Sequence, residues 1–220
     1  MTRPLASMCT LCLLCTAAWK AEAQELSAAE RSDAPPVAEA SPQTRLELDA
    51  PNLLVPTLHA SALMLSMRVA EAYIWPEPFA ESPSHWGAHY EEAFTLPPKW
   101  DSDARAFEWD GDPWYINVIG HGLFGSELYL RARHCHLGVA GSLLFTSAAS
   151  ATWEYGFEAN GVRPSGFDLW FTPLSGLVLG EGRYWAWRAA GSVGQKTLRG
   201  VLRAVLDPFG ELERAAGTRC

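Results

Sequence analysis

The sequence predicts an all-α protein, a compact bundle of about five helices preceded by a loop rich in proline and tryptophan. Apolar residues recur at three- to four-residue spacing in several segments, which is the period of an amphipathic helix. No segment shows the alternation of polar and apolar residues that is typical of a strand. The central segments are rich in glycine, alanine and serine, which let helix backbones approach closely. With 220 residues, the chain suffices for one domain with a substantial core.

The N-terminal 23 residues predict a signal peptide, and therefore export to the periplasm or the outer membrane. A basic Arg3 is followed by an apolar stretch over residues 5–18 and by a small-x-small triplet over residues 21–23. The apolar stretch is too short for a retained anchor, which needs about 20 residues. Residues 24–50 are rich in Ala, Glu, Ser and Pro without apolar periodicity, so we expect a disordered linker there.

A single helical domain is expected over residues 51–210, with a tail over 211–220. Its first helix covers residues 57–75, where apolar side chains recur at helical spacing before Pro76. Residues 76–114 lack this periodicity, and we expect an ordered, aromatic-rich loop. Helical spacing then returns in four further segments, at about 115–134, 138–159, 165–188 and 193–206.

Charge and composition limit the choice of partners. The formal net charge is −8 and the chain has no run of Lys or Arg, which argues against binding to nucleic acid. Contact with a membrane or another envelope component would have to come from apolar and aromatic surface. Two interpretations of the Gly-, Ala- and Ser-rich helices stay open, a compact soluble bundle with tight crossings and a bundle partly sunk in a membrane. No oligomeric state is predicted.

Two cysteines remain once the leader is removed, Cys135 and Cys220. An oxidising compartment would permit a bridge between them, but two cysteines do not form a disulfide framework. We therefore expect a buried Cys135 and a free Cys220, with a disulfide as the alternative.

Two short histidine motifs contain residue types that bind metals. HWGAH, over residues 85–89, has two histidines at i and i+4, but tryptophan stands where zinc proteases have glutamate. RHCHLG, over residues 133–138, is equally well explained as a polar helix end. No metal and no cofactor are therefore predicted.

The segment SAASATWEYGFEA places two carboxylates on a helix face without bases. On a helix that advances about 100° per residue, Ser147, Glu154 and Glu158 fall within about 40° of one another. Residues 137–159 contain no Lys or Arg, unlike an ordinary solvated face. The pattern favours a polar seam inside the bundle, where a buried charge needs a partner. Three candidate partners share a face of the preceding helix, namely Asn117, His121 and Arg131.

The stretch PSGFDLW adds one more acid to this set. Pro164 and Ser165 have the pattern of a helix start, and Asp168 lies in the first turn, where the helix dipole favours a carboxylate. Asp168 therefore has a structural explanation as well as a functional one, and both stay open.

Three stretches, NVIGHGLFGSELYLRAR, SAASATWEYGFEA and PSGFDLWFTPLSGLVLGE, occur in this order within residues 109–182. Together they resemble a bacterial family catalogued as domain of unknown function 3943 (DUF3943), whose members have no established activity. Gly122 departs from the family, which usually has proline after the histidine. More loosely, the order of polar residues resembles that of VanZ-like envelope proteins. The first resemblance implies as signature positions Asn117, His121, Gly125, Tyr129, Arg131, Trp153, Glu154, Glu158, Pro164, Ser165, Asp168, Thr172, Gly176, Gly180 and Glu181.

Two functions are compatible with these residues. The first is an exported cell-envelope protein, a membrane-associated helical module without catalytic activity. The second is an envelope hydrolase or transferase that acts on a lipid or glycolipid. In the first, a buried polar network consists of Asn117, His121, Arg131, Glu154, Glu158 and Asp168.

The enzyme hypothesis gives these residues chemical roles. His121 would be the general base, oriented by Glu154, and Arg131 would bind an anionic headgroup. Glu158 and Asp168 would complete an acid or metal cluster. Asn117 and Ser165 are further candidates for binding. An open cavity lined by His121 and Glu154 would favour this hypothesis over the buried network.

Overall fold

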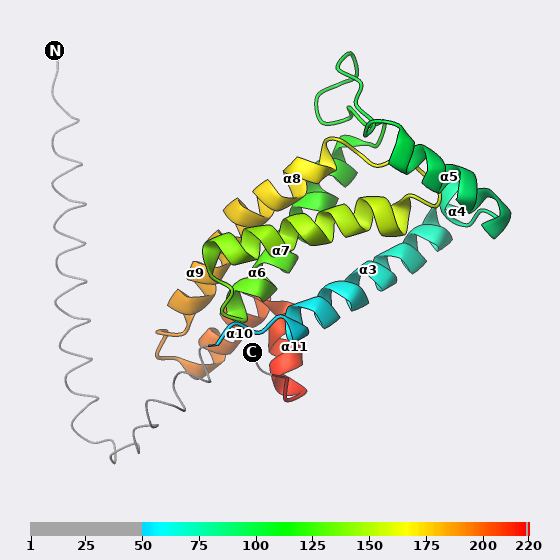
Figure 1. Ribbon diagram of the computed structural model, residues 1–220. Helices are drawn as coiled ribbons and strands as arrows, with labels where there is room; N and C mark the ends of the chain where they lie inside the picture. Colours follow the sequence, from blue (N-terminus) through cyan, green and yellow to red (C-terminus); the bar gives the residue numbers. More distant parts are fainter. Residues whose placement is uncertain (1–49, 219) are drawn as a thin grey trace, which may run out of the picture. The chain divides into compact units, whose positions relative to one another are not determined.

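The computed structural model describes residues 50–218 and 220, and within this part of the chain every regular element is a helix (Figure 1). These residues form one compact unit. The predicted all-α class is thus confirmed, although the helices are more numerous than the five expected. The expected signal peptide and, apart from Ala50, the expected linker lie outside the described residues.

Nine α-helices and three wider π-helical turns build the described unit. Residues 115–134, 138–159 and 165–188, predicted as helical segments, correspond to η1–α6, α7–η2 and α8–η3–α9. A π-helical turn forms i→i+5 hydrogen bonds and often occurs at a functional site. In chain order the elements are α3 (Leu54–Ile74), α4 (Pro76–Phe79), α5 (Pro83–Thr95), η1 (Ile116–Gly120), α6 (His121–His134), α7 (Gly138–Thr152), η2 (Trp153–Glu158), α8 (Asp168–Ser175), η3 (Gly176–Gly180), α9 (Glu181–Ala190), α10 (Lys196–Leu206) and α11 (Pro208–Ala215).

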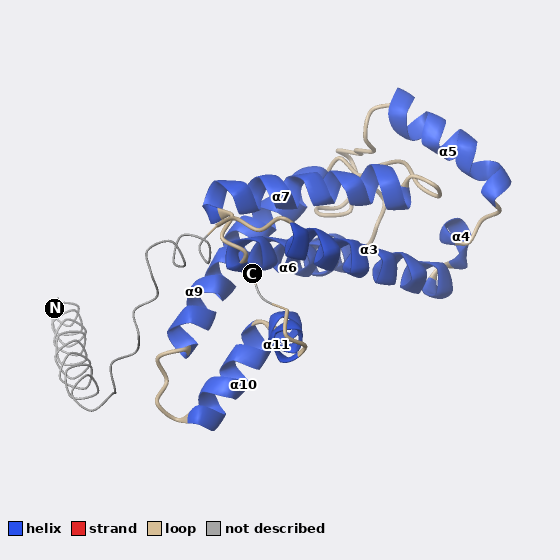
Figure 2. Ribbon diagram, turned by 60° about the horizontal axis from the view of Figure 1, so that its bottom comes forward, coloured by secondary structure: helices blue, strands red, loops and turns tan. Residues whose placement is uncertain are grey.

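Helix α6 is the centre of the bundle. Of its 14 residues, 11 are buried, and it packs against α3, α7, α8, η3 and α9 (Figure 2). The buried face that it shares with α3, α7 and η2 is apolar, which places the main core between these elements. This core contains Ala60, Met64, Phe124, Leu128, Ala149 and Trp153.

Glycines set the distance between α6 and the helix formed by α8 and η3. A Cβ atom on Gly125 would lie 2.0 Å from the carbonyl oxygen of Thr172, and one on Gly176 would lie 2.7 Å from the carbonyl oxygen of Gly125. No side chain fits between backbones at such distances. The tight packing predicted from the glycine content therefore occurs at this crossing.

The region predicted as a loop, residues 76–114, contains two helices, so that expectation is wrong in part. Both α4 and α5 have a proline in their first turn, where the missing N–H costs nothing and the fixed φ angle suits a helix. Helix α11 also begins with a proline, Pro208, and extends into residues 211–220, which were expected to be a tail. Pro76, which the sequence predicts as the end of the first helix, thus also begins the next one.

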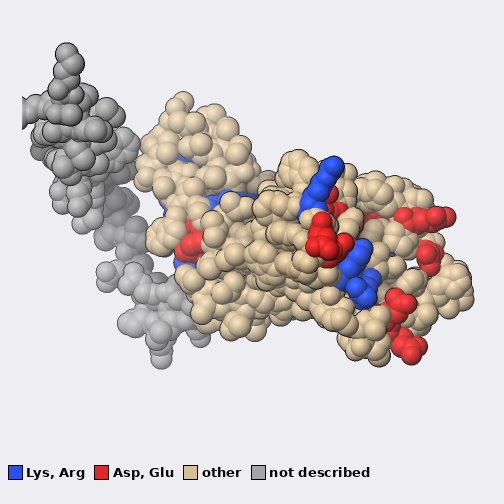
Figure 3. All heavy atoms as spheres, turned by 90° about the horizontal axis from the view of Figure 1, so that it is seen from above, with Lys and Arg blue, Asp and Glu red and all other residues tan. Residues whose placement is uncertain are grey.

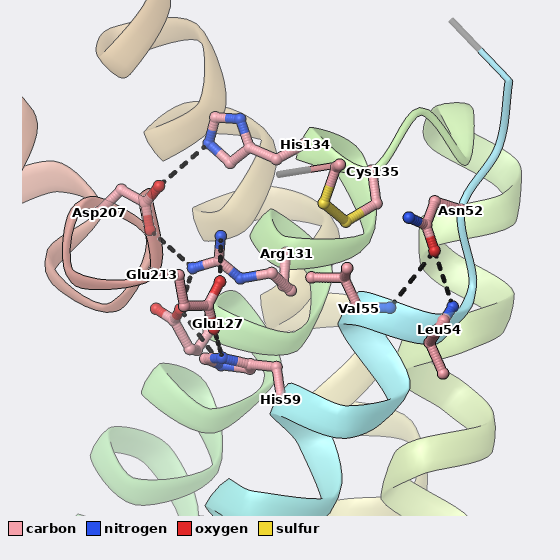
Figure 4. Close-up of a disulfide and its surroundings, with 11 residues drawn as sticks. Asn52, Leu54, Val55, His59, Glu127, Arg131, His134, Cys135, Asp207 and Glu213 are labelled. Atoms are coloured by element: carbon pink, nitrogen blue, oxygen red, sulfur yellow. Dashed lines mark hydrogen bonds and ion pairs between the residues drawn. A yellow bond between two sulfur atoms is a disulfide. The ribbon is translucent and has the colours of Figure 1, made fainter. Parts of the chain in front are cut away.

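The C-terminus returns to the end of α6. Cys135 and Cys220 form a disulfide, so the expected free Cys220 is wrong (Figure 4). The physical reason is α11, which reverses the chain and brings its last residues beside Cys135. The backbone N–H of Asn52 also donates to the carbonyl oxygen of Cys135, at 3.0 Å, so both ends of the described unit meet α6 at the same place.

Much of the surface over the middle of the bundle has no charge. Helix α7 contains no charged residue, and none follows Asp168 in α8 and η3. In Figure 3 the charged side chains gather toward one end of the molecule, and few lie over its middle. Among the described residues, no helix combines the length and the apolar character needed to cross a membrane.

Candidate functional site

Three buried polar side chains meet where α6 crosses α8. His121 is the first residue of α6, Glu154 lies in the π-helical turn η2, and Asp168 is the first residue of α8. One potential ligand atom from each residue lies within 4.8 Å of the other two. The three residues are only 7%, 1% and 1% exposed. Segments far apart in the sequence thus place an imidazole and two carboxylates in one enclosed site.

Both ring nitrogens of His121 have neighbours on α8. Nδ1 lies 3.0 Å from the hydroxyl oxygen of Thr172, and Nε2 lies 3.5 Å from Oδ2 of Asp168. Thr172 and Asp168 are four residues apart on α8, so they face the same side of that helix. If Nδ1 donates its proton to Thr172, the lone pair of Nε2 faces the carboxylate.

Ser165 connects the carboxylates of the site. Its backbone N–H donates to Oε2 of Glu154 at 2.7 Å, and its hydroxyl donates to Oδ2 of Asp110 at 2.5 Å. The serine oxygen also accepts from the backbone N–H of Asp168 at 3.1 Å. The side-chain amide of Asn117 donates to Oδ1 of Asp110 at 2.7 Å. Asn117 and Ser165, both predicted as binding residues, therefore lie in one hydrogen-bonded network around the site.

Two carboxylate oxygens in this site lack a hydrogen-bond partner among the described residues, Oε1 of Glu154 and Oδ1 of Asp168. Within the same part of the chain, neither residue forms an ion pair with a lysine or an arginine, and the only ion-pair partner of Asp168 is His121. A buried carboxylate without compensation is costly. The site therefore needs protons or a cation.

Burial and mutual repulsion determine the protonation of these groups. Burial, together with the nearby acid Asp110, raises the pKa of Glu154 to about 8. Burial and the Glu154 carboxylate raise the pKa of Asp168 to about 10. Burial lowers the pKa of His121 to about 4. In the absence of a bound cation, His121 is therefore neutral at pH 7 and the two carboxyl groups hold protons.

Further acids lie next to the site, toward α3. Glu158, at the end of η2, is half-buried, and burial and the Glu154 carboxylate raise its pKa well above the usual range. Burial also raises the pKa of Glu71, on α3, to about 7, although Arg68 opposes this shift. Buried acids with raised pKa values thus extend beyond the central triad of residues.

His121 and Arg131 are the alternative partners predicted for Glu154 and Glu158, and only His121 lies with Glu154 in this site. Arg131 is not part of it, so that alternative is wrong. It lies on the same face of α6 as His121, but ten residues later, about 15 Å farther along the helix axis. The prediction used the angle around the helix and ignored the distance along it. Figure 4 shows Arg131 in a second buried network beside the disulfide, where its ion-pair partners are Asp207 at 3.1 Å, Glu213 at 3.2 Å and Glu127 at 3.5 Å.

Sequence reasoning missed two acids near the site, Asp110 and Glu71. Asp110 lies in a segment without periodicity, so no spacing pattern connects it to Ser165. Glu71 lies on α3, and only tertiary packing brings it near η2. Thr172 entered only as a signature position, yet it is the hydrogen-bond partner of His121.

Two surface cavities of the described residues lie away from the three residues. One of about 530 Å³ is bounded by α3 and α11, and another of about 440 Å³ by α3, α6 and residues 205–209. His121 and Glu154 line neither of them. Enclosure of these two side chains is expected of a buried network and differs from the open pocket that the enzyme hypothesis requires.

Comparisons with known proteins give one finding. The comparisons with curated proteins and with solved structures gave no match, and the looser resemblance to VanZ-like proteins has no support. The family described as "Domain of unknown function (DUF3943)" matches residues 106–209, which include η1, α6, α7, η2, α8, η3, α9 and α10. All three residues of the site lie within this match. This match confirms the predicted resemblance to the DUF3943 family over residues 106–209.

Proposed function

We propose that this protein is an exported component of the cell envelope that binds to a membrane surface through α10 and the apolar surface beside it. The orientation of α10 is the observation that carries this proposal. The helix is strongly amphipathic, and its apolar face points outward. A helix that served only to close the bundle would turn this face inward.

Three apolar side chains of α10 are exposed, Leu198 by 45%, Val201 by 55% and Val205 by 73%. They lie within about 60° of one another on the helix. Two arginines on the other side of the helix are half-buried, and the guanidinium group of Arg203 lies 4.2 Å from the ring centroid of Trp187 on α9. The side chain of Arg203 thus holds α10 against α9, and the apolar face of α10 stays exposed.

The neighbouring surface has the same character. Phe209 and Leu212 of α11 are also exposed, and the cavity of about 440 Å³ beside Val205 is lined mainly by apolar residues. Between residues 182 and 206 the chain has five bases and no acid. A basic amphipathic helix binds to an anionic lipid surface through both its charge and its apolar face. The local charge therefore suits an anionic membrane, although the net charge of the chain is negative.

Sedimentation with lipid vesicles tests this proposal. The wild-type protein should sediment with vesicles that contain phosphatidylglycerol and less with vesicles of phosphatidylcholine alone. Val205→Asp should reduce this binding at least several-fold, because a carboxylate on the apolar face cannot enter the interface. Tyr73→Asp is the matched control, since Tyr73 is 85% exposed at the far end of α3. Equal binding by wild type and Val205→Asp, or equal losses in both variants, would refute α10 as the contact.

Export is tested separately in cells. A periplasmic reporter fused to the C-terminus should be active with the complete chain and inactive when residues 1–23 are deleted. Fractionation should then place the protein with the membranes, and carbonate should release it, because α10 lies on the surface. Activity of the reporter without the leader would show that residues 1–23 do not direct export.

A further inference from the structure

The triad of His121, Glu154 and Asp168 offers one imidazole and two carboxylates at distances suited to a shared cation. We propose that these three residues bind one divalent transition-metal ion, Zn²⁺ or Mn²⁺. The proposal is independent of membrane binding, since α10 contributes no residue to the site. It rests on the geometry, on two oxygens without partners and on the residues that fix the ligands.

Geometry is the first argument. Ligand atoms that share a metal ion at about 2.0–2.2 Å lie roughly 3–4.5 Å from one another. The potential ligand atoms of the three residues all lie within 4.8 Å of one another. Small side-chain adjustments would bring them onto one ion. The three ligand residues lie at the start of α6, in η2 and at the start of α8, so the packing of these elements fixes their relative positions.

The two oxygens without partners are the second argument. Oε1 of Glu154 and Oδ1 of Asp168 belong to residues that are each 1% exposed, so bulk solvent does not reach these two oxygens. The other acids near them supply no positive charge, and no lysine or arginine of the described residues pairs with either. A divalent cation would give both oxygens a partner and would neutralise two carboxylates at once.

The surrounding residues are the third argument. Metal-binding histidines usually donate their other ring N–H to a fixed acceptor, which sets the tautomer and the ring orientation. The hydroxyl oxygen of Thr172 lies 3.0 Å from Nδ1 of His121 and would be this acceptor with Nε2 on the metal. Ser165 fixes Glu154 through its backbone N–H, and Asp110 fixes Ser165 through its hydroxyl. Two of the three ligand groups, the imidazole of His121 and the carboxylate of Glu154, are therefore held by a second residue, which is the arrangement of a prepared metal site.

Donor types indicate which ions would bind. Two carboxylates alone would suit Mg²⁺ or Ca²⁺, whereas an imidazole favours transition metals. The mixed set favours Zn²⁺ or Mn²⁺. Three protein ligands would leave at least one position of the ion for water, as in catalytic rather than structural zinc sites.

Metal analysis of the full-length protein tests the proposal. After treatment with a chelator and dialysis, the wild-type protein should take up about one equivalent of Zn²⁺ or Mn²⁺, and its melting temperature should rise. Asp168→Asn and Glu154→Gln keep the size of each side chain, so both variants should fold and bind at least about tenfold more weakly. Thr172→Val should also weaken binding by about tenfold, because it removes the acceptor for Nδ1.

A second histidine cluster supplies the control. His85 and His89 lie 3.4 and 3.2 Å from Glu81 at the surface, where Zn²⁺ could bind adventitiously. The double variant His85→Gln/His89→Gln should bind the metal as the wild type does. The proposal is overturned if the folded wild-type protein binds neither metal at micromolar concentration. It is also overturned if Asp168→Asn and Glu154→Gln bind normally, or if the double variant alone loses the metal. Circular dichroism establishes that each variant is folded.

Discussion

A methyl group at Gly125 should destabilise the bundle, because the contact between α6 and α8 leaves no room for it. The added Cβ would lie 2.0 Å from the carbonyl oxygen of Thr172, 2.9 Å from its carbonyl carbon and 3.0 Å from Oγ of Ser175. Backbone atoms cannot rotate away, so the helices would have to separate by about 1 Å. Overpacking of this kind costs about 1–3 kcal/mol or more, after a gain of about 1 kcal/mol from replacing glycine by alanine in a helix.

Gly122→Ala is the control on the same helix. A Cβ there would meet its nearest neighbours at 3.9 Å, an ordinary contact, so only the gain in helix propensity remains. Thermal and urea unfolding should show a lower free energy of unfolding for Gly125→Ala and an equal or higher one for Gly122→Ala. If Gly125→Ala unfolds like the parent, the proposed close crossing is wrong.

Three further predictions concern the site and the disulfide. In chelator, the free energy of unfolding should fall as the pH rises from 7 to 9, because folded Glu154 (pKa about 8) and Asp168 (pKa about 10) retain protons that the unfolded chain has already released. Each retained proton lowers the free energy of unfolding by roughly 1.4 kcal/mol per pH unit. A melting temperature that does not change with pH would contradict this. In chelator at pH 7, Glu154→Gln should unfold like the parent, whereas Glu154→Ala should lose about 1–3 kcal/mol because it leaves the N–H of Ser165 unpaired, and equal losses in denaturant titrations would refute this explanation. Cys220→Ser should lower stability by about 4 kcal/mol in calorimetry, because the disulfide closes a loop with a sequence separation of 85, and an unchanged melting temperature would show that the bond does not constrain the unfolded chain.

The helical class was predictable because its signal is local. Apolar spacing and turn residues located η1–α6, α7–η2 and α8–η3–α9 to within a few residues. The short helices α4 and α11 were not found, because Pro76 and Pro208 were interpreted only as the ends of the preceding helices. Helix α5 was not found because its segment lacks apolar periodicity. A proline that ends one helix and begins the next gives the same local pattern as a loop.

The residue types of the site could be predicted from the sequence, but the contacts between them could not. The absence of bases between residues 137 and 159 indicated that Glu154 faces a polar seam, and Glu154 is indeed buried. The tilt of α8 against α6 decides whether His121 or Arg131 is close to the acids, and no pattern within a single helix encodes that tilt. The π-helical turn η2 also ends the 100° spacing on which the angular argument depended. Contacts between helices, rather than faces of single helices, determine this site.

The close crossing couples the packing of the bundle to the metal ligands. Thr172 contacts Gly125 through its carbonyl oxygen and holds His121 through its hydroxyl, so a shift of α8 that makes room at Gly125 also moves the acceptor of the imidazole. Gly125→Ala should therefore weaken Zn²⁺ uptake about tenfold even at temperatures where the variant is folded. Met64→Ala should lose at least as much stability, about 2–5 kcal/mol, from the core between α3 and α6, without displacing α8. Equal Zn²⁺ uptake by the two folded variants would show that metal binding does not depend on the close crossing of α6 and α8. A loss confined to Gly125→Ala would show that the glycine holds the ligands in place.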